Sequence, residues 1–326
     1  MGHKRKRKSG FATWIEYAAL RTTCAVVNAI PYRLACALAR GTAWTLVRIL
    51  GFQRARTYAR IREVFPEKHP KEVRRIAVFS LANILQNAVE MIRAPRLTKK
   101  WITKHVKDMS VYASRLQAIL AEGKGAVIMV PHAGNWYMAA WAMARYGMPR
   151  CAIAARQRNP RINAWMARQY DTIEVLTRGD AATLHDIRER ICNGRAFAIL
   201  PDLRVPSPDV EVPFLNGTAN VSHGGALFAV ATGAPLVVAM MRRENGFHTF
   251  DHLATLRPDP DAPDKKEEAC RLTREAMALL DAAIQKTPEQ WFWYNKRWLL
   301  QPVKRRKSKR APAAPTAAAD RTACTD

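Results

Sequence analysis

The spacing of apolar and polar positions divides the chain into two parts. Residues 11–93 repeat apolar positions every three to four residues, which predicts helices. Pro31 divides the first stretch into two helices, and the turn Phe65–Pro70 separates two more. From about residue 111, short apolar runs alternate with helical stretches, a pattern typical of βα units. The sequence therefore predicts an α/β fold, with a mainly parallel central sheet flanked by helices.

Glycine, proline and capping residues set the expected boundaries in this second part. The expected strands are short apolar runs, at 126–130, 151–155, 173–176, 197–200, 235–240 and 247–256. The expected helices are 116–122, 136–146, 160–170, 181–192, 222–232 and the helix after Asp264. Asn135 is the predicted N-cap of helix 136–146, and Asp264 with Glu267 forms a capping-box pattern.

The charge of the chain changes the picture, because it predicts anionic partners. The 326 residues carry 53 Lys and Arg against 27 Asp and Glu, a net charge of +26. Such an excess favours nucleic acid, an anionic membrane or an acidic protein. Part of it lies in two predicted disordered tails, 1–10 and 304–326, which flank a domain predicted to span 11–303. The excess persists between the tails, so they do not account for all of it.

Two interpretations remain open for the N-terminal helices, residues 11–52. Tryptophan, leucine and alanine alternate there with arginine, as in helices that lie in a membrane interface. An ordinary amphipathic helix pair packed on the domain has the same periodicity. The start imitates a secretory signal, but Pro31 and Arg33 interrupt it, and no run reaches the roughly 20 apolar residues that span a bilayer.

The six cysteines give no evidence for a metal site. They are scattered, without a Cys-x-x-Cys pair or a cysteine and histidine cluster at ligand spacing. Neither a zinc centre nor a disulfide framework is predicted, and a reducing compartment is the simpler assumption.

The candidate chemistry starts in the turn after strand 126–130. His132, Gly134 and Asn135 lie there, between the carboxyl end of a strand and the start of a helix. Open α/β sheets place their functional groups at this edge. A lone histidine is more often structural. It becomes a useful general base when its pKa lies near 7 and a second group holds its other ring nitrogen.

Two further stretches follow strands in the same way. Arg156 and Arg158, with Asn159, come after strand 151–155 and could clamp phosphates or a phosphopantetheine arm. A solvated basic loop would have the same composition. Asp202 and Arg204 come after strand 197–200, followed by a glycine-containing loop that leads into helix 222–232. These two side chains could equally form an ion pair that fixes a loop.

Taken in order, these stretches resemble the lysophospholipid acyltransferase superfamily, and within it the lipid A late acyltransferases. The resemblance covers nearly the whole ordered chain. The matching segments are Pro131–Trp136, Arg156–Pro160, Pro201-Asp202 with Pro213-Phe214 and Gly217, and Pro288–Trp293 with Arg297-Trp298. Each motif is moderately specific, and their common order makes the resemblance strong.

The resemblance implies a glycerolipid acyltransferase-like fold and an O-acyltransferase on the cytoplasmic face of the inner membrane. Its partners would be acyl-carrier protein as donor, a phosphorylated lipid acceptor and an anionic membrane surface, with no metal or other cofactor. His132 would take the proton from an acceptor hydroxyl. The implied substrate-binding residues are Gly134, Asn135, Trp136, Arg156, Arg158, Asn159, Asp202 and Arg204.

One position departs from the family pattern. The superfamily has Asp or Glu five residues after the histidine, but this chain has Tyr137. In triad enzymes, loss of the group that orients the histidine costs about 10⁴ in rate. A carboxylate from elsewhere, such as Asp202 or Glu90, could substitute.

The sequence therefore leaves two main hypotheses. The first is an active lipid acyltransferase. The second is an altered homologue that binds acyl lipid or carrier without efficient transfer, with Tyr137 in place of the acid. A nucleic-acid-binding function rests on charge alone, because helix-turn-helix, zinc-finger and RNP signatures are missing. No nucleic-acid partner is therefore predicted.

Overall fold

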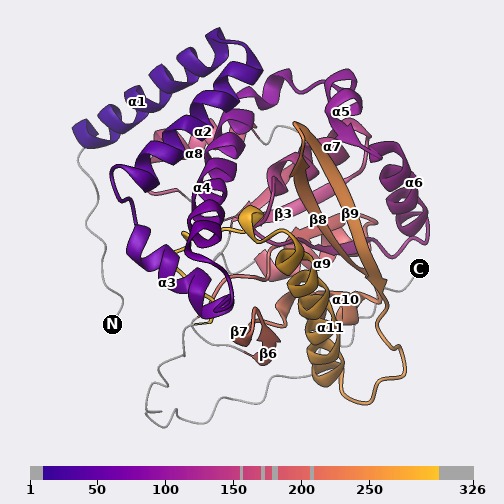
Figure 1. The fold of residues 1–326 in the computed structure, drawn as a ribbon. Helices are drawn as coiled ribbons and strands as arrows, with labels where there is room; N and C mark the ends of the chain where they lie inside the picture. The colour runs from indigo at the N-terminus through magenta and orange to yellow at the C-terminus, as the bar shows by residue number, and fades with distance from the viewer. Residues whose placement is uncertain (1–9, 155–156, 170–172, 178–182, 206–208, 301–326) are drawn as a thin grey trace.

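The computed structural model describes most of the chain between the two predicted basic tails. The described residues are 10–154, 157–169, 173–177, 183–205 and 209–300. Residues 1–9 and the whole segment 304–326 therefore lie outside this part of the chain, and so does Arg156. Figure 1 shows the arrangement of the described elements.

Helices and strands follow one another as the sequence predicts, with a few additions. The helices are α1 (Gly10–Ala29), α2 (Tyr32–Arg48), α3 (Arg54–Val64), α4 (Pro70–Arg93), η1 (Ala94–Arg96), α5 (Lys99–His105), α6 (Met109–Leu120), α7 (Trp136–Arg145), α8 (Pro160–Gln169), α9 (Thr183–Cys192), α10 (Gly224–Thr232), α11 (Lys265–Lys286) and η2 (Pro288–Gln290). The strands are β1 (Val106–Lys107), β2 (Ala126–Met129), β3 (Arg150–Ala154), β4 (Glu174–Thr177), β5 (Ala196–Ile199), β6 (Val210–Phe214), β7 (Gly217–Val221), β8 (Leu236–Glu244) and β9 (Phe247–Leu256).

The central sheet is mainly parallel, so the predicted α/β class is confirmed. Its strand order is β1-β9-β8-β2-β5-β3-β4. Strands β8, β2, β5, β3 and β4 pair in parallel, and β9 runs antiparallel to β8. Alternate residues of β2 point to opposite faces: Val127 and Met129 enter one core cluster, and Ala126 and Ile128 the other. The sheet thus lies between two apolar layers.

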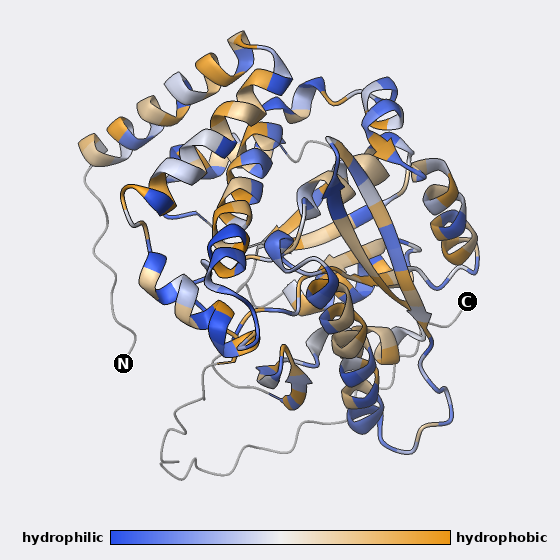
Figure 2. Cartoon of the chain, in the orientation of Figure 1, coloured by the Kyte–Doolittle hydropathy of each residue, from blue (hydrophilic) through white to orange (hydrophobic). Residues whose placement is uncertain are grey.

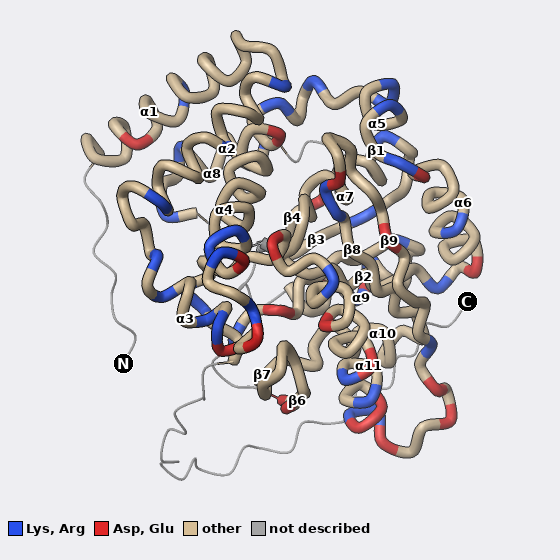
Figure 3. Tube along the Cα trace, viewed as in Figure 1, with Lys and Arg blue, Asp and Glu red and all other residues tan. Residues whose placement is uncertain are grey.

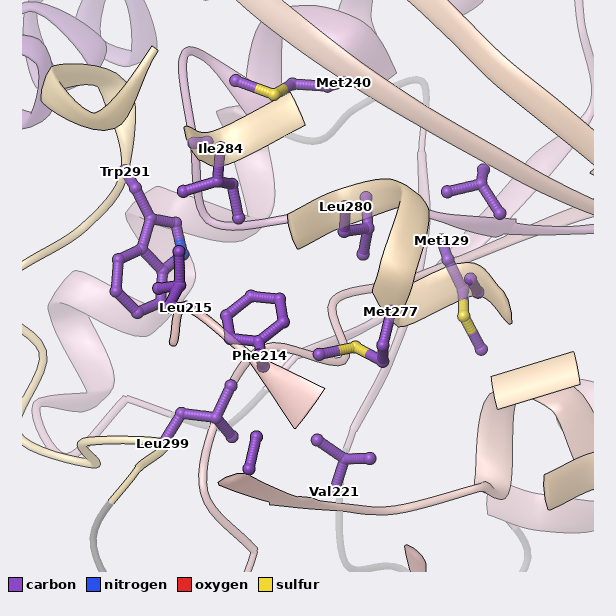
Figure 4. Close-up of a cluster of buried hydrophobic side chains, with 14 of the residues drawn as sticks. Met129, Phe214, Leu215, Val221, Met240, Met277, Leu280, Ile284, Trp291 and Leu299 are labelled. Carbon is purple, nitrogen blue, oxygen red and sulfur yellow. The ribbon is translucent and has the colours of Figure 1, made fainter. Parts of the chain in front are cut away.

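The two layers contain different helices. The first cluster includes buried residues of α4, α9, α10 and α11, and Figure 4 shows part of it, where Phe214, Leu280 and Trp291 lie close together. The second cluster includes α5, α6, α7 and α8. Because each helix buries one face on the sheet, the carboxyl edge of the parallel strands remains for the loops that carry polar side chains.

The segment expected to be a glycine-containing loop forms a second, two-stranded sheet instead. Strands β6 and β7 pair antiparallel, and the two turn residues Leu215 and Asn216 have φ of 48° and 56°. Positive φ at both central positions is the geometry of a tight hairpin turn. Burial alternates along β6, with Val210, Val212 and Phe214 facing inward, a period-two pattern too short to stand out in the sequence.

The N-terminal helices pack on the domain through one face and expose apolar side chains on another. The inner face of α2 packs on α4 through Ala35, Cys36 and Ala39. Its outer face exposes large apolar side chains, as does the outer face of α1, and Figure 2 shows this apolar colouring along both helices. These exposed residues are Phe11, Trp14, Ile15, Val26, Leu34, Leu38, Trp44, Ile49 and Leu50. Among the described residues, no helix is long and apolar enough to cross a bilayer.

A buried carboxylate ties the helical layer to the sheet. Glu90 of α4 is fully buried and accepts hydrogen bonds from Arg243 (2.6 and 2.8 Å), Tyr32 (2.5 Å), His248 (3.1 Å) and the amide of Asn135. Burial acts to raise the pKa of Glu90, but the charges and hydrogen bonds of Arg243 and His248 lower it well below the ordinary value. The ionised carboxylate therefore connects α4 to α2, α7, β8 and β9.

The entry to β2 provides a test of backbone packing. Gly125 has φ +63°, and a Cβ there would lie 2.3 Å from the carbonyl oxygen of Ile191 and 2.8 Å from that of Arg195. We expect Gly125→Ala to lower the free energy of unfolding by about 3 kcal/mol, measured by urea denaturation. Gly123 is the matched control, because its φ is +79° and a Cβ would have no neighbour within 4 Å. Equal losses for both variants would contradict the steric explanation.

The Glu90 network predicts a pH-dependent loss of stability. Glu90→Gln leaves Arg243 buried without its counter-charge, and we expect a loss of about 3 kcal/mol at pH 7. Because the pKa of Glu90 is lowered by folding, its contribution is complete above about pH 4.3 and fades as the pH falls through the folded-state value. The wild type and Glu90→Gln should therefore differ less in their free energy of unfolding at acid pH than at pH 7. Glu122→Gln, which breaks an exposed pair with Arg257, should cost less than about 1 kcal/mol.

Candidate active site

The sheet register brings His132 and Asp202 to the same height. Strands β2 and β5 are parallel neighbours, and Met129 pairs with Ile199. His132 lies three residues beyond Met129, and Asp202 lies three residues beyond Ile199. Equal offsets from a paired position place both side chains side by side at the carboxyl edge of the sheet.

Asp202 holds the histidine through both of its oxygens. His132 Nδ1 lies 2.7 Å from Oδ1 of Asp202, and the backbone N–H of His132 donates to Oδ2 at 2.7 Å. The carboxylate is buried, whereas 18% of the His132 side chain is exposed. Because Nδ1 donates to the carboxylate, the lone pair of Nε2 remains on the opposite side of the ring.

A third donor completes the environment of the acid. The indole N–H of Trp291 donates to Oδ2 of Asp202 at 2.8 Å. Burial acts to raise the pKa of Asp202, but the charge of His132 and the hydrogen bonds from His132 and Trp291 lower it below the ordinary value. The acid is therefore ionised at neutral pH and faces the imidazole as an anion.

The turn that carries His132 is fixed by its backbone. The carbonyl of Gly134 accepts from Asn83 (2.8 Å) and Asn87 (2.7 Å), and its N–H donates to the carbonyl of Gln290 at 2.9 Å. Gly134 has φ +54°, and a Cβ there would lie 1.6 Å from the carbonyl oxygen of Met241. Only glycine fits this approach.

Asn135 is the N-cap of α7, as the sequence predicts. Its side-chain oxygen accepts from the N–H of Met138 at 3.0 Å, and its amide nitrogen donates to Glu90. Since Asn135 is fully buried, its contacts are with the protein. The buried Glu90 network therefore reaches the His132 turn through Asn135, and also through Asn83 and Asn87, which accept from Arg243 and donate to the carbonyl of Gly134.

The amides of the turn are already used by the fold. The N–H groups of His132, Gly134 and Asn135 donate to Asp202, Gln290 and Met241, respectively. An oxyanion hole needs donors that point at the developing charge. These three amides are therefore excluded from that role.

Tyr137 does not take the place of an acid beside Nδ1, because Asp202 holds that nitrogen. Its ring packs between two tryptophans, with centroids 5.2 Å from Trp136 and 5.9 Å from Trp141. Trp136 itself meets the His132 ring edge to face at 5.1 Å. Tyr137 belongs to an aromatic row along α7, and the carboxylate comes from a different strand.

The other predicted site residues follow strands at the same edge. Arg158 is exposed in the loop after β3, and Arg204 is partly exposed two residues after Asp202. Asn159 is buried: its oxygen accepts from the N–H of Arg161 at the start of α8, and its amide donates to Thr13 of α1 at 2.8 Å. Its contacts therefore join α8 to α1. Strands β2, β5 and β3 are neighbours, so the loops that follow them leave the same edge of the sheet.

Sequence reasoning missed the part played by the C-terminal aromatic segment. The sequence placed Trp291 only within a matching motif, yet its indole donates to Asp202, and the backbone carbonyl of Gln290 accepts from the N–H of Gly134. The sequence feature that pointed to this segment was its match to the family motif, Pro288–Trp293. Within the described ranges, no group of three or more His, Cys, Asp or Glu side chains is arranged to hold a metal ion.

Comparison with known proteins finds similarity to phosphatidylinositol mannoside acyltransferases. Phosphatidylinositol mannoside acyltransferase of Mycolicibacterium smegmatis is 24% identical over 255 residues, which cover 76% of this chain and 79% of that protein. The Mycobacterium tuberculosis enzyme of the same name is 28% identical over 153 residues. That match covers 45% of this chain, and the chain spans about half (48%) of the length of that relative.

A family model agrees with these similarities and with the ordered motifs. The model of the bacterial lipid A biosynthesis acyltransferases matches residues 3–300, which include the His132 turn, Asp202 and the C-terminal aromatic segment. The predicted resemblance to this family is confirmed. The chain belongs to the bacterial lipid A biosynthesis acyltransferase family.

Proposed function

We propose that the protein transfers a fatty acyl chain to a hydroxyl of a membrane glycolipid, with His132 as general base. The observation that carries this proposal is the 2.7 Å bond between His132 Nδ1 and the buried Asp202 carboxylate. A histidine becomes a competent base when a carboxylate orients its ring and stabilises the imidazolium that forms. Family membership supports acyl transfer as the reaction class.

The proposed reaction is a direct acyl transfer from a thioester. Nε2 of His132 removes the proton from the acceptor hydroxyl while the hydroxyl oxygen attacks the thioester carbonyl. The tetrahedral intermediate collapses, the carbon–sulfur bond breaks, and the thiolate receives the proton from the imidazolium. Asp202 stays ionised throughout and stabilises the imidazolium. The products are the acyl ester and the free thiol.

Stabilisation of the oxyanion is assigned to basic side chains. The amides of His132, Gly134 and Asn135 are used by the fold. Arg158 and Arg204 lie in the loops after β3 and β5, at the same edge of the sheet as His132. A guanidinium there would stabilise the charge on the thioester oxygen or bind a phosphate of either substrate.

Acyl-carrier protein is the proposed donor, and a phosphorylated glycolipid, such as a lipid A precursor, is the proposed acceptor. Acyl-carrier proteins and phosphorylated lipids are anionic, and the net charge of +26 favours both. Figure 3 shows Lys and Arg spread along α3, the start of α4 and α5. The family description and the names of the relatives both refer to acylation of glycolipids.

The outer face of α1 and α2 is the proposed membrane contact, placed on the cytoplasmic leaflet of the inner membrane. Its exposed apolar residues would enter the interface. A shallow basic cavity of about 460 Å³ adjoins the end of α2, lined by Arg54, Arg56 and Lys296 among others. Arg54 donates to the carbonyl of Arg48 at 3.4 Å and Arg56 donates to the side chain of Gln53, so neither bond neutralises the charge, which would attract anionic headgroups.

The altered-homologue hypothesis loses its main support. It rested on Tyr137 in place of the acid, but His132 is paired with the carboxylate of Asp202. If Asp202 has the role proposed here, the identity of residue 137 does not decide whether the site is active.

The first test measures acyl transfer directly. Purified protein is incubated with acyl-loaded carrier protein and a lipid A precursor or a phosphatidylinositol mannoside, and mass spectrometry records the gain of one acyl chain. We expect activity in the wild type and a loss of about 10⁴ in kcat for Asp202→Asn, because the imidazole loses its ionised partner. His132→Gln should be at least as impaired.

Position 137 provides the matched control. Tyr137→Phe should keep activity within a few fold of the wild type, and Tyr137→Glu should not increase it, because Asp202 already holds Nδ1. A large gain with Tyr137→Glu, together with an unaffected Asp202→Asn variant, would show that the acid has been wrongly assigned. Inactivity of the wild type toward both acceptors, with acyl-lipid binding preserved, would instead support the altered homologue.

The second test addresses the membrane surface by co-sedimentation with vesicles. Replacing both Leu38 and Trp44 with Glu should reduce binding to anionic vesicles by about a hundredfold. Each of these side chains, once it enters the bilayer, would contribute about 1.5 kcal/mol or more to binding. Val111→Glu on α6 is the control, because Val111 is exposed to a similar degree (60%, against 54% for Leu38) on a different part of the molecule. Equal binding by all variants would exclude the α2 face.

A further inference from the structure

We propose that Trp291 is a positioning residue of the active site, acting on His132 through Asp202. The inference rests on the proposed function, in which His132 is the base. Trp291 lies 89 residues beyond Asp202 and belongs to the C-terminal aromatic segment. The resemblance and the family match identify this segment only as a sequence motif, without a chemical role.

The geometry gives Asp202 three donors that fix its orientation. Oδ1 bonds to Nδ1 of His132 at 2.7 Å, and Oδ2 accepts from the backbone N–H of His132 at 2.7 Å and from the indole of Trp291 at 2.8 Å. The two bonds from His132 tie the carboxylate to the turn that it must orient. The indole bond is the contact that anchors it to an independent part of the fold.

Trp291 is itself held in place. Its side chain is 3% exposed, and its carbonyl accepts from the hydroxyl of Ser80 at 2.5 Å. Its backbone forms a β-bridge with Ala133, and the preceding carbonyl, that of Gln290, accepts from the N–H of Gly134. The same short segment therefore contacts both the histidine turn and the carboxylate. The distance between the turn and Asp202 thus depends on the position of this C-terminal segment.

The indole N–H also affects the proton affinity of the pair. A buried carboxylate that loses a donor carries more uncompensated charge, so it holds the proton of its histidine partner more tightly. Without the indole bond, His132 would stay protonated to a higher pH, and only the two bonds from the histidine itself would orient the carboxylate. Both effects reduce the fraction of protein in which Nε2 can accept a proton.

Trp293 offers a matched comparison within the same segment. It is fully buried, its ring centroid lies 5.0 Å from that of Trp291, and its indole also donates a hydrogen bond. That bond ends on the carbonyl of Pro288 (2.6 Å) and not on Asp202. Phenylalanine at either position removes a buried indole bond, so the two variants should lose similar stability and differ only at the active site.

The experiment compares Trp291→Phe with Trp293→Phe in the full chain. One measurement is the pH dependence of kcat and kcat/KM for acyl transfer. The other is the NMR titration of the His132 imidazole, assigned with His132→Gln. For Trp291→Phe we expect kcat to fall about tenfold with KM unchanged. The acid limb of its pH–rate profile and the midpoint of the His132 NMR titration should both move up by about half a pH unit. Trp293→Phe should leave kcat, the acid limb of the pH–rate profile and the His132 titration midpoint unchanged.

Matching kcat values and titrations in the two variants would overturn the inference. If the wild type transfers no acyl chain, the proposed function fails, whereas the NMR titration still decides whether Trp291 acts on the pair. Should Trp291→Phe unfold, benzothienylalanine at position 291 replaces the N–H by sulfur and keeps the ring shape. An unchanged His132 titration in that protein would equally rule out the indole bond as the cause.

Discussion

The buried charge of Glu90 is the constraint on which the assembly of the molecule depends. Its carboxylate is bonded to side chains from α2, α7, β8 and β9. Separating β8 from α4 would leave the buried charges of Glu90 and Arg243 without their partners in a low-dielectric interior, at a cost of several kcal/mol. The network therefore holds the N-terminal helices against the sheet. Through Asn135 it also fixes the start of α7, so fold stability and the position of the His132 turn have a common origin.

The molecule uses two buried carboxylates for separate purposes. The charge of Glu90 is neutralised by Arg243, and neither oxygen is exposed to solvent. Asp202 has no basic side chain bonded to it other than His132 among the described residues, so its charge is directed at the imidazole. Turn amides that would be free in a looser loop are committed to the scaffold. The result is a histidine whose ring and backbone are both held by the fold, which in the proposed reaction would reduce the reorganisation needed for proton transfer.

Local signals in the sequence were sufficient for much of this arrangement. Periodicity predicted the helices on both sides of Pro31, and capping chemistry placed Asn135 and Asp264 correctly at helix starts. The pairing of His132 with Asp202 could only be suggested as one of two options, because it depends on β2 and β5 being neighbours, and strand order is not a local property. The hydrogen bond from Trp291 to Asp202 could not be predicted for the same reason, because it joins residues far apart in the sequence. The β6–β7 hairpin was missed because burial alternates over only five residues in β6 and does not alternate in β7.

Supplying the acid from a neighbouring strand has a consequence for how members of this family are classified. An acid five residues after the histidine lies on α7, whereas Asp202 is supported by β5 and by the C-terminal segment. Position 137 is thereby released to serve the aromatic packing of Trp136 and Trp141. If Asp202 has the role proposed above, a missing acid in that motif is poor evidence for an inactive protein. The informative comparison is whether the aspartate and the tryptophan, distant in the sequence, are retained or lost together.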